Sequence, residues 1–587
     1  MRKNKMIGLV LLAVLATAVH AQKASDAAHK IRLDFNRWHD YDELKVDMLR
    51  LEKAFPKFLK YRSLGKSYAG RDMMLMTINN PDTGEELEKA AMYIEANVHG
   101  NEIQGSEVCL YTIWYLMEQY GKNDKITKLV DERVFYILPT VNPDGRQYFM
   151  EGGGRGARTG HMKVDSDNDG LYDEDGDDDL NGNGVIDQIR KYVPGKGTHR
   201  ISHVDKRIME PVPAGETGDW VLLGREGIDN DGDGLVNEDG PGGYDPNRNW
   251  ASDWQPNYIQ RGSMDYPFQL PAARAVNDFL MVKPNIAGVQ SYHNSGGMLL
   301  RGPGAEWQGT YPEDDIRVYD ELGKNGERML PYYRYIVIWS GLYTVHGGFI
   351  DWTNDGLGIV SFSNELWAGG QYFNSPALKK QQEEDKNSPI ADRQGANFFF
   401  DDFLQFSEEF ADWTPYDHPQ YGKVEMGGWK KTRGRLPPRF MNEELCHRNM
   451  AFTLYHADQM PKLALDELKT EKINRGVFRV RLDIKNERLL PTITAQANKN
   501  QVVRPDLLSL EGKGLEIISV GWVRNKHRPG PTELIDQKQL NRVMVRNGLA
   551  GHTTKTVEYL VKGTGKGTIT YSSAKGGTVQ QAFSLAN

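Results

Sequence analysis

Apolar and polar positions over most of the chain predict strands and helices in turn. Residues 90–98 form a mostly apolar run of strand length, and residues 103–116 then carry apolar side chains at helical spacing. The same pattern predicts further buried strands at 133–138, 284–292 and 358–363, and helices at 41–55, 271–282 and 442–455. Strands that alternate with helices are typical of an α/β fold, in which helices cover the faces of a sheet.

The pattern changes at about residue 473. Residues 477–484 alternate between apolar and polar side chains with a period of two, and Gly and Asn turns separate the later short strands. Those strands are predicted at 515–523, 554–561 and 567–572. This pattern predicts an antiparallel β-sandwich over residues 472–587, after a first domain over residues 30–465. No cluster of site-like residues occurs in the sandwich.

The N-terminus has the pattern of a secretory signal. Arg2, Lys3 and Lys5 precede an apolar run over residues 7–19, and Ala21 is a small residue suited to a cleavage site. A membrane anchor is the alternative, but this run is shorter than the roughly 20 residues that span a bilayer. We therefore expect removal of residues 1–21, export to the periplasm or the medium, and no stable membrane insertion.

Composition narrows the class of protein further. Hydrophobic residues make up 39% and charged residues 26% of the 587 positions, as in ordinary soluble globular proteins. The net charge of −8 comes with no basic patch of the kind that nucleic acid binding requires, so we expect no nucleic-acid partner. The two cysteines, Cys109 and Cys446, stand in separate apolar helical stretches, which favours two buried thiols.

Much of the negative charge lies in an Asp-rich insertion at about residues 159–243. Residues 165–187 contain ten acidic side chains and no Lys or Arg. Carboxylates at alternate positions before a Gly turn suit calcium, and this pattern begins at 165, recurs with amides at 179, and recurs again at 229. The EF-hand Glu is absent from the twelfth position, and a solvated acidic loop is the alternative. Three repeats favour Ca²⁺, with candidate ligands Asp165, Asp167, Asp169, Asp173, Asp229, Asp231 and Asp233.

A different metal site is indicated by His99 and Glu102. These residues stand three apart in the turn between the 90–98 strand and the next helix, so both side chains can face one cation. His293, at the end of the strand predicted at 284–292, would complete the set. Two imidazoles and one carboxylate form a catalytic zinc set that leaves one coordination position open.

Five short frames in a fixed order carry a resemblance to a known family. They are His-Gly-Asn-Glu at 99–102, Asp-Pro-Asn-Arg-Asn-Trp at 245–250, Ser-Tyr-His at 291–293, Tyr343 with Gly-Gly-Phe-Ile-Asp-Trp at 347–352, and Phe-Ser-Asn-Glu-Leu at 362–366. This order resembles that of the zinc metallocarboxypeptidases of the carboxypeptidase A/B type. The resemblance implies a mixed eight-stranded sheet with helices on both faces, one Zn²⁺ per site, and hydrolysis of the C-terminal peptide bond of peptides or proteins.

The matching residues have the chemistry that this reaction needs. Glu365 is the expected general base, which takes a proton from water and later delivers it to the leaving amine. A separate cation should stabilise the oxyanion of the tetrahedral intermediate. By position this cation is Arg158 or Arg155, and Arg158 is the preferred candidate.

Substrate selection is expected to depend on four other residues. The guanidinium fork of Arg248 suits a free C-terminal carboxylate. The resemblance implies that Asn247 adds a hydrogen bond, that Tyr343 closes over the substrate, and that Ile350 lies at the base of the side-chain pocket. An apolar base predicts a preference for neutral or hydrophobic C-terminal residues, because a basic side chain would be unpaired there.

Two other functions remain open at this point. The same zinc site could hydrolyse cell-wall peptides. The presence of Asn247, Arg248 and Tyr343 favours removal of C-terminal residues from ordinary peptides but does not exclude cell-wall peptides as substrates. Alternatively, the chain could be a calcium-dependent binding protein with an inactive peptidase domain. The presence of all three zinc candidates and of Glu365 ranks that hypothesis last.

Overall fold

The computed structural model describes residues 29–152, 158–165, 169–369, 390–525 and 532–586. For residues 390–396 it describes the backbone alone. The predicted signal at 1–21, Arg155 and Asp167 lie outside these ranges. Among the described residues, no helix is long and apolar enough to cross a membrane. Cys109 and Cys446 are free, buried thiols, as predicted.

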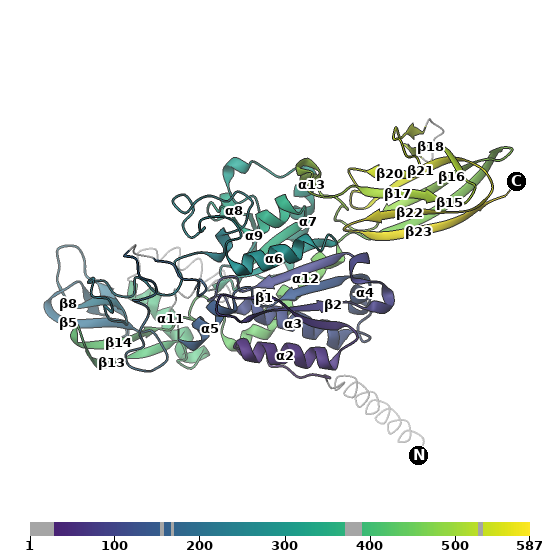
Figure 1. Ribbon diagram of the computed structural model, residues 1–587. Helices are drawn as coiled ribbons and strands as arrows, with labels where there is room; N and C mark the ends of the chain where they lie inside the picture. Colours follow the sequence, from purple (N-terminus) through teal and green to yellow (C-terminus); the bar gives the residue numbers. More distant parts are fainter. Residues whose placement is uncertain (1–28, 153–157, 166–168, 370–389, 526–531, 587) are drawn as a thin grey trace, which may run out of the picture.

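One mixed sheet of eight strands forms the centre of the first part of the chain (Figure 1). The strand order is β1-β2-β4-β3-β9-β12-β10-β11, and the central strands β4, β3, β9 and β12 run parallel. β2 joins this group antiparallel on one side, and β10 joins it antiparallel on the other. The strands are β1 Leu59–Lys66, β2 Asp72–Ile78, β3 Ala91–Ala96, β4 Val134–Leu138, β9 Ile286–Asn294, β10 Met298–Arg301, β11 Arg334–Val337 and β12 Val360–Leu366. The predicted α/β fold with a mixed eight-stranded sheet is confirmed.

Helices cover both faces of this sheet because its central strands are apolar on both sides. In β3, Met92 and Ile94 point into one core, whereas Ala91 and Tyr93 point into the other. The first core is closed by α2 Tyr41–Ala54, α3 Gln104–Gln119, α4 Asp124–Glu132, α7 Glu313–Met329 and α12 Asn442–Asp458. The second is closed by α6 Pro271–Met281, α8 Ile338–Gly341 and α9 Phe349–Asp351. A short helix, α5 Pro143–Glu151, follows β4.

The strands that carry the predicted site residues end later than the sequence indicates. The third and fourth buried strands were expected to end at residues 292 and 363, but β9 and β12 continue to Asn294 and Leu366. The reason is a parallel register in which Glu365 pairs with His293. Both predicted site residues therefore lie within paired strands, where the backbone holds them firmly.

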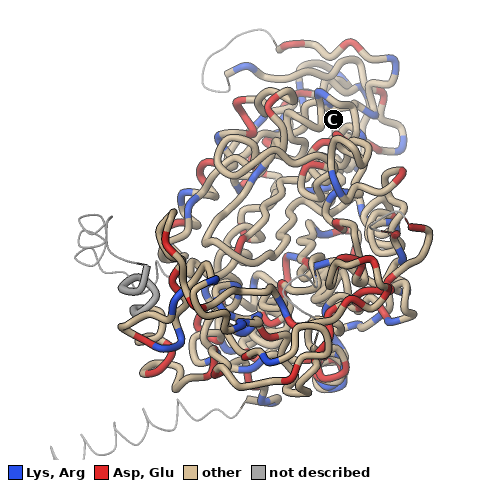
Figure 2. Tube along the Cα trace, turned by 90° about the vertical axis from the view of Figure 1, so that its left-hand side faces the viewer, with Lys and Arg blue, Asp and Glu red and all other residues tan. Residues whose placement is uncertain are grey.

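The Asp-rich insertion builds a second, six-stranded sheet that the hydrophobic pattern does not predict. Its order is β13-β14-β5-β8-β6-β7, so strands from the insertion pair with strands more than 180 residues later. Acidic and basic positions are both spread over this side of the molecule (Figure 2). Its strands are β5 Gln188–Gly197, β6 His199–Ile201, β7 Met209–Pro211, β8 Gly218–Arg225, β13 Phe410–His418 and β14 Gly422–Trp429, with α11 Ile390–Leu404 before β13.

The C-terminal part consists of two antiparallel sheets that enclose their own core. The five-stranded sheet has the order β15-β16-β21-β18-β19, and the four-stranded sheet has the order β20-β17-β22-β23. Their strands are β15 Leu463–Asn474, β16 Val477–Asn486, β17 Asp506–Glu511, β18 Glu516–Val523, β19 Glu533–Leu534, β20 Arg542–Val545, β21 Thr553–Lys562, β22 Gly565–Ser573 and β23 Gly577–Leu585, with α13 Ala495–Asn500 between β16 and β17.

Candidate metal centre and active site

The candidate site lies beyond the carboxyl ends of the four parallel strands. In an open α/β sheet, this edge is where ligands bind, because loops from several strands meet there. β3 leads to His99 and Glu102, β9 carries His293, and β12 carries Glu365. All four side chains line one cavity of about 250 Å³.

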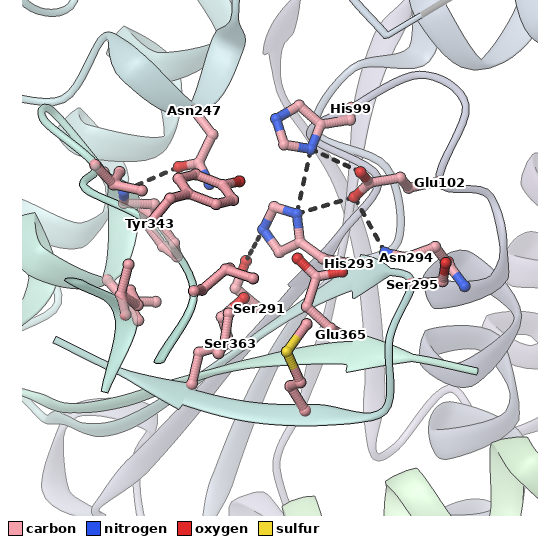
Figure 3. Close-up of a pocket in the computed structure, with 18 of the residues that line it drawn as sticks. His99, Glu102, Asn247, Ser291, His293, Asn294, Ser295, Tyr343, Ser363 and Glu365 are labelled. Atoms are coloured by element: carbon pink, nitrogen blue, oxygen red, sulfur yellow. Dashed lines mark hydrogen bonds and ion pairs between the residues drawn. The ribbon is translucent and has the colours of Figure 1, made fainter. Parts of the chain in front are cut away.

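His99, Glu102 and His293 form a compact, buried set of ligand atoms (Figure 3). The Nδ1 atoms of the two histidines lie 3.2 Å apart, and each faces a different oxygen of Glu102, at 3.1 Å from His99 and 2.9 Å from His293. Two imidazole nitrogens and a carboxylate that converge in this way fit zinc, with space left for a fourth ligand.

The opposite nitrogen of each imidazole is also held. Asp245 Oδ1 lies 2.9 Å from His99 Nε2, and Ser291 Oγ lies 3.3 Å from His293 Nε2. Partners on Nε2 fix the ring orientation and favour a proton on that nitrogen, so the lone pair of Nδ1 faces the centre of the set. This arrangement is the observation that makes the three residues suitable for a metal.

The ionisable groups of the site strongly affect one another's pKa values. Burial raises the pKa of Glu102, but the charges and hydrogen bonds of His99 and His293 outweigh it and hold that pKa well below the ordinary value. Burial likewise raises the pKa of Asp245, but its interactions with Arg248, His99 and Arg158 hold that pKa well below its ordinary value. Both carboxylates are therefore ionised and available as hydrogen-bond acceptors or ligands.

Glu365 has the environment of a proton carrier. Burial first, and the negative charge of Glu102 second, raise the pKa of Glu365 to about 7, against the opposing charges of His293, Arg158 and Arg435. A carboxyl group whose pKa lies near neutrality can both accept and return a proton. Its place in β12 beside His293 of β9 keeps it next to the metal ligands.

Two arginines reach Glu102 from different segments. Arg158 donates from Nη1 to Glu102 Oε1 at 3.0 Å and from Nη2 to Asp245 Oδ2 at 3.2 Å. Arg435 donates from Nη1 to the same Glu102 oxygen at 3.4 Å. Both side chains line the cavity and are about one-third exposed, so they can also contact a ligand there.

The predicted carboxylate-binding residues lie on one side of the cavity. Asn247 accepts a hydrogen bond from the backbone N–H of Phe349 at 3.0 Å, which leaves its amide NH₂ for another partner. The Arg248 guanidinium is buried and donates to the backbone carbonyl of Asn247 at 2.7 Å. Tyr343 is half exposed at the rim, where it can move onto a ligand.

Next to these residues the cavity is lined by apolar side chains. Ile350 is buried at this part of the cavity. The other apolar lining residues are Met298, Leu300, Ile338, Leu342, Val345 and Phe349. The neighbouring residue Asp351 also lines the cavity, and its carboxyl oxygens lie close to the backbone of Gly302 and Gly304. Burial raises the pKa of Asp351 to about 8, with a contribution from Asp355, so Asp351 is uncharged at neutral pH.

The comparisons with known proteins agree with this arrangement. A sequence profile described as "Zinc carboxypeptidase" matches residues 45–388, which is more than half of the chain. The chain belongs to the zinc carboxypeptidase family. A second profile, described as a domain of unknown function, matches residues 462–584 and so covers the two C-terminal sheets.

Individual relatives of this family member match over shorter stretches. Human carboxypeptidase D is 34% identical over 120 residues, which is 20% of this chain and 9% of that protein. A zinc carboxypeptidase of Saccharothrix mutabilis subsp. capreolus is 31% identical over 114 residues, or 19% of this chain and 26% of that protein. The chain thus aligns with about a tenth to a quarter of these relatives. The solved structure of thrombin activatable fibrinolysis inhibitor is 16% identical and covers 72% of this chain and 74% of its own, with a TM-score of 0.43.

Sequence reasoning missed two charged residues in the zinc carboxypeptidase site. Asp245 is part of the frame at 245–250, and its position two residues before Asn247 could have marked it as a partner of the metal ligands. Arg435 lies outside the profile match, in a segment with no recognisable motif. Only the fold of the second sheet shows that Arg435 reaches the cavity.

The three acidic repeats of the insertion adopt one loop geometry. In each repeat the first Asp accepts a hydrogen bond from the Gly N–H five residues on, and the fifth residue accepts from the N–H two residues on. Carboxylate oxygens of Asp229, Asp231 and Asp233 lie within 4.8 Å of one another. In the first repeat, Asp165 and Asp169 occupy the positions of Asp229 and Asp233, and Asp173 occupies the position of Asn237.

Buried oxygens without partners recur at one position of these loops. The ninth residues of the three repeats are Asp173, Asp187 and Asn237, and each has a buried Oδ1 that receives no hydrogen bond from the residues that the structure describes. Asp187 is only 3% exposed. Since buried polar oxygens are nearly always paired, three orphans at equivalent positions point to a missing common partner. A calcium ion, which takes several oxygen ligands, would supply it.

Proposed function

We propose that this protein is an exported zinc carboxypeptidase that removes neutral or hydrophobic residues from the C-termini of peptides. The observation that carries the proposal is one cavity that joins the His99–Glu102–His293 set and Glu365 to Asn247 and Arg248. The comparisons favour neither the cell-wall hydrolase nor the inactive binding protein.

Each residue has a separate part in the reaction. Zinc held by His99, Glu102 and His293 would polarise the substrate carbonyl and lower the pKa of water towards about 7. Glu365 takes the proton of the attacking water and returns it to the leaving amine. Arg158, one-third exposed at the cavity, pairs with the developing oxyanion.

Arg248 and Asn247 select a free C-terminus over an internal peptide bond. A buried guanidinium whose acidic neighbour is shared with other cations can still bind a substrate carboxylate well, because the new ion pair is shielded from water. The nearest acidic group, Asp245, is 3.8 Å from Arg248 Nη2 and is shared with His99 and Arg158. An amidated C-terminus would leave the Arg248 charge unpaired.

The apolar lining around Ile350 determines which C-terminal side chain fits. A Phe or Leu side chain loses contact with water there, which is favourable at roughly 25 cal/mol per Å². A Lys or Glu side chain would be buried among mainly apolar side chains, and the one carboxyl group beside Ile350, that of Asp351, is uncharged at neutral pH because burial raises its pKa to about 8.

A peptide panel tests the activity and the specificity together. We expect the zinc-loaded protein to release Phe or Leu from N-blocked peptides with kcat/KM at least about tenfold above that for Lys or Glu. C-terminally amidated copies serve as matched controls and should release nothing. Preferred release of Lys or Glu would refute the specificity, and equal cleavage of the amides would refute the carboxypeptidase activity.

Export rests on the sequence of residues 1–21, which has the order of a basic segment, an apolar segment and a small-residue cleavage site. The Asp-rich loops add support, because millimolar calcium outside the cytosol suits weak extracellular sites. N-terminal sequencing of the protein recovered from outside the cytosol should begin near Gln22, and an intact Met1 would contradict this proposal.

We also propose that the acidic loops bind structural calcium. The first and third loops are tied together by reciprocal contacts, in which Asp239 accepts from the N–H of Asp173 and Asp175 accepts from the N–H of Asn237. Arg158 stands seven residues before Asp165, where the first loop begins, and Asp245 stands eight residues after Asn237, the ninth residue of the third loop. Calcium in this loop pair would therefore hold two charged residues of the active site in place.

Calcium removal tests this proposal separately from zinc. Depletion with a calcium-selective chelator should lower Tm by about 3 °C for each site, the shift expected when a ligand at about 100 times its Kd is withdrawn from a domain of more than 400 residues. Zinc content, measured in the same samples, should not change. Asp231→Ala should abolish the calcium effect, whereas Asp412→Asn, an exposed residue of the same six-stranded sheet, should not. Equal Tm with and without calcium would contradict the proposal.

A further inference from the structure

Arg435 enters the active site on a loop that the family profile does not include. The loop, residues 430–436, follows β14 and lies beyond the profile match at 45–388. Its neighbour Leu436 is buried against Ile103 and Phe149, next to the metal-ligand turn. The backbone carbonyls of Gly434 and Arg435 accept hydrogen bonds from Ser295 and Asn294. The loop is thus fixed on the main sheet, and Arg435 is held at the cavity.

The contacts of Arg435 use only part of its guanidinium group. Nη1 donates to the backbone carbonyl of Asn294 at 2.9 Å and to Glu102 at 3.4 Å. Within the described part of the chain, Nε and Nη2 have no acceptor at hydrogen-bonding distance. The side chain is 34% exposed and lines the cavity. A purely structural partner of Glu102 would not need this exposed edge.

The position of Arg435 relates it to a particular part of the substrate. Figure 3 shows Asn247 and Tyr343 on one side of His293, and Asn294 and Ser295 on the other. A peptide whose carboxylate lies at Asn247 and whose scissile bond lies at the metal set must continue towards Asn294. Arg435, bonded to the Asn294 carbonyl, therefore borders the residue before the scissile bond.

We propose that Arg435 binds the carboxylate of an acidic side chain at the penultimate position of the substrate. This inference rests on the proposed carboxypeptidase function. The other arginines nearby are engaged: Arg158 pairs with Glu102 and Asp245, and Arg433 stacks over the Trp429 ring at 3.7 Å. An incoming carboxylate can pair with the exposed Nε and Nη2 of Arg435, the fork that suits carboxylates. The enzyme would prefer peptides that end in an acidic residue followed by an apolar one.

Peptide affinity tests the inference without requiring turnover. The ligands are two N-blocked peptides that end in Glu-Phe and Gln-Phe, which differ in charge but hardly in shape. Calorimetry on the zinc-loaded Glu365→Gln protein should give an approximately tenfold lower Kd for the Glu-Phe peptide. Adding Arg435→Gln should bring the ratio of the two Kd values to about one. Raising the salt concentration should also reduce it, because the pair is partly exposed to solvent.

Matched variants separate recognition from a structural effect. Arg433→Gln, on the same loop but stacked on Trp429, should keep the preference, and Arg435→Lys should restore part of it. Zinc content of every variant is measured, because Arg435 also contacts Glu102. Two results would overturn the inference. One is equal Kd values for the two peptides in the Glu365→Gln protein that retains Arg435, and the other is an unchanged Kd ratio after Arg435→Gln. If the Glu365→Gln protein prefers the Glu-Phe peptide but the wild-type protein releases no amino acid, only the proposed function is refuted.

Discussion

At the scale of single residues, Asp245 connects the metal-ligand set to the residues proposed to bind the substrate carboxylate. Its carboxylate contacts His99 Nε2 at 2.9 Å, two nitrogens of Arg158 at 3.2 and 3.3 Å, and the backbone N–H of Asn247 at 2.8 Å. One partly buried carboxylate thus orients a metal ligand, the proposed oxyanion-binding cation and the turn that carries Asn247 and Arg248. This connection explains why His99 presents Nδ1 rather than Nε2 to the centre.

Asp245→Asn should weaken zinc binding with little change in volume. Loss of the carboxylate partner of a metal-ligating histidine lowers metal affinity by about 10- to 100-fold. Competition with a chromophoric chelator measures the zinc Kd directly. Ser291→Ala, which removes the longer 3.3 Å contact to His293, is the matched control and should have a smaller effect. Wild-type zinc affinity in Asp245→Asn would contradict this role.

The sequence predicted individual site residues best where backbone position and chemistry coincide. His99, Glu102 and His293 could be placed together because each follows or ends an apolar run, and parallel strands end at one edge. Asn247, Arg248 and Tyr343 were found through the family resemblance. Arg435 could not be predicted, because its approach depends on Leu436 packing against Ile103 and Phe149, more than 280 residues away.

Whole elements also differ in whether the local sequence predicts them. The buried strands of the main sheet are apolar on both faces and stood out in the sequence, although β9 and β12 extend further than predicted. The strands of the second sheet did not, because β5 and β8 are largely exposed and bear no regular alternation. β5 is stabilised by a partner far along the chain, through the Arg190–Glu425 ion pair in the β5–β14 pairing.

One buried lysine joins the C-terminal sheets to the strand that carries His293. Lys575, in the turn between β22 and β23, donates from Nζ to the backbone carbonyl of Ile286 at the start of β9, at 2.7 Å. Burial lowers the pKa of Lys575 to about 7, whereas an unfolded lysine titrates near 10.4. Between these values the unfolded chain binds a proton that the folded chain lacks, so this group makes stability rise with pH.

Lys575→Met should remove that pH dependence. In urea unfolding, the difference in unfolding free energy between wild type and Lys575→Met should shift in favour of wild type as pH rises from 7 to 9. The expected shift is about 2 kcal/mol, because each pH unit contributes about 1.4 kcal/mol once the folded protein has lost the proton that the unfolded chain keeps. Lys566→Met, an exposed position of β22, should show no such trend. A constant difference across this pH range would show that Lys575 is charged in the folded protein.

At the scale of the whole molecule, the main sheet and the six-stranded sheet, with their connecting loops, supply the charged residues of the site. The main sheet supplies His293 and Glu365 and positions His99 and Glu102, and the connections into and out of the insertion supply Arg158 and Asp245. The loop after β14 of the second sheet supplies Arg435. The C-terminal sheets contact the far end of β9 through Lys575 and add no residue to the cavity. The acidic loops lie between Arg158 and Asp245 in the chain, so the proposed calcium binding would influence how these two residues are held.

The most direct test of the account is release of C-terminal Phe by zinc-loaded wild type and by zinc-loaded Glu365→Gln. A general base contributes about 100- to 10,000-fold, so the variant should lose that factor in kcat while its zinc content and peptide Kd stay close to wild type. Wild-type release should also stop when zinc is stripped and return when zinc is restored. Undiminished release by Glu365→Gln, or release that does not depend on zinc, would contradict a zinc carboxypeptidase mechanism in this site.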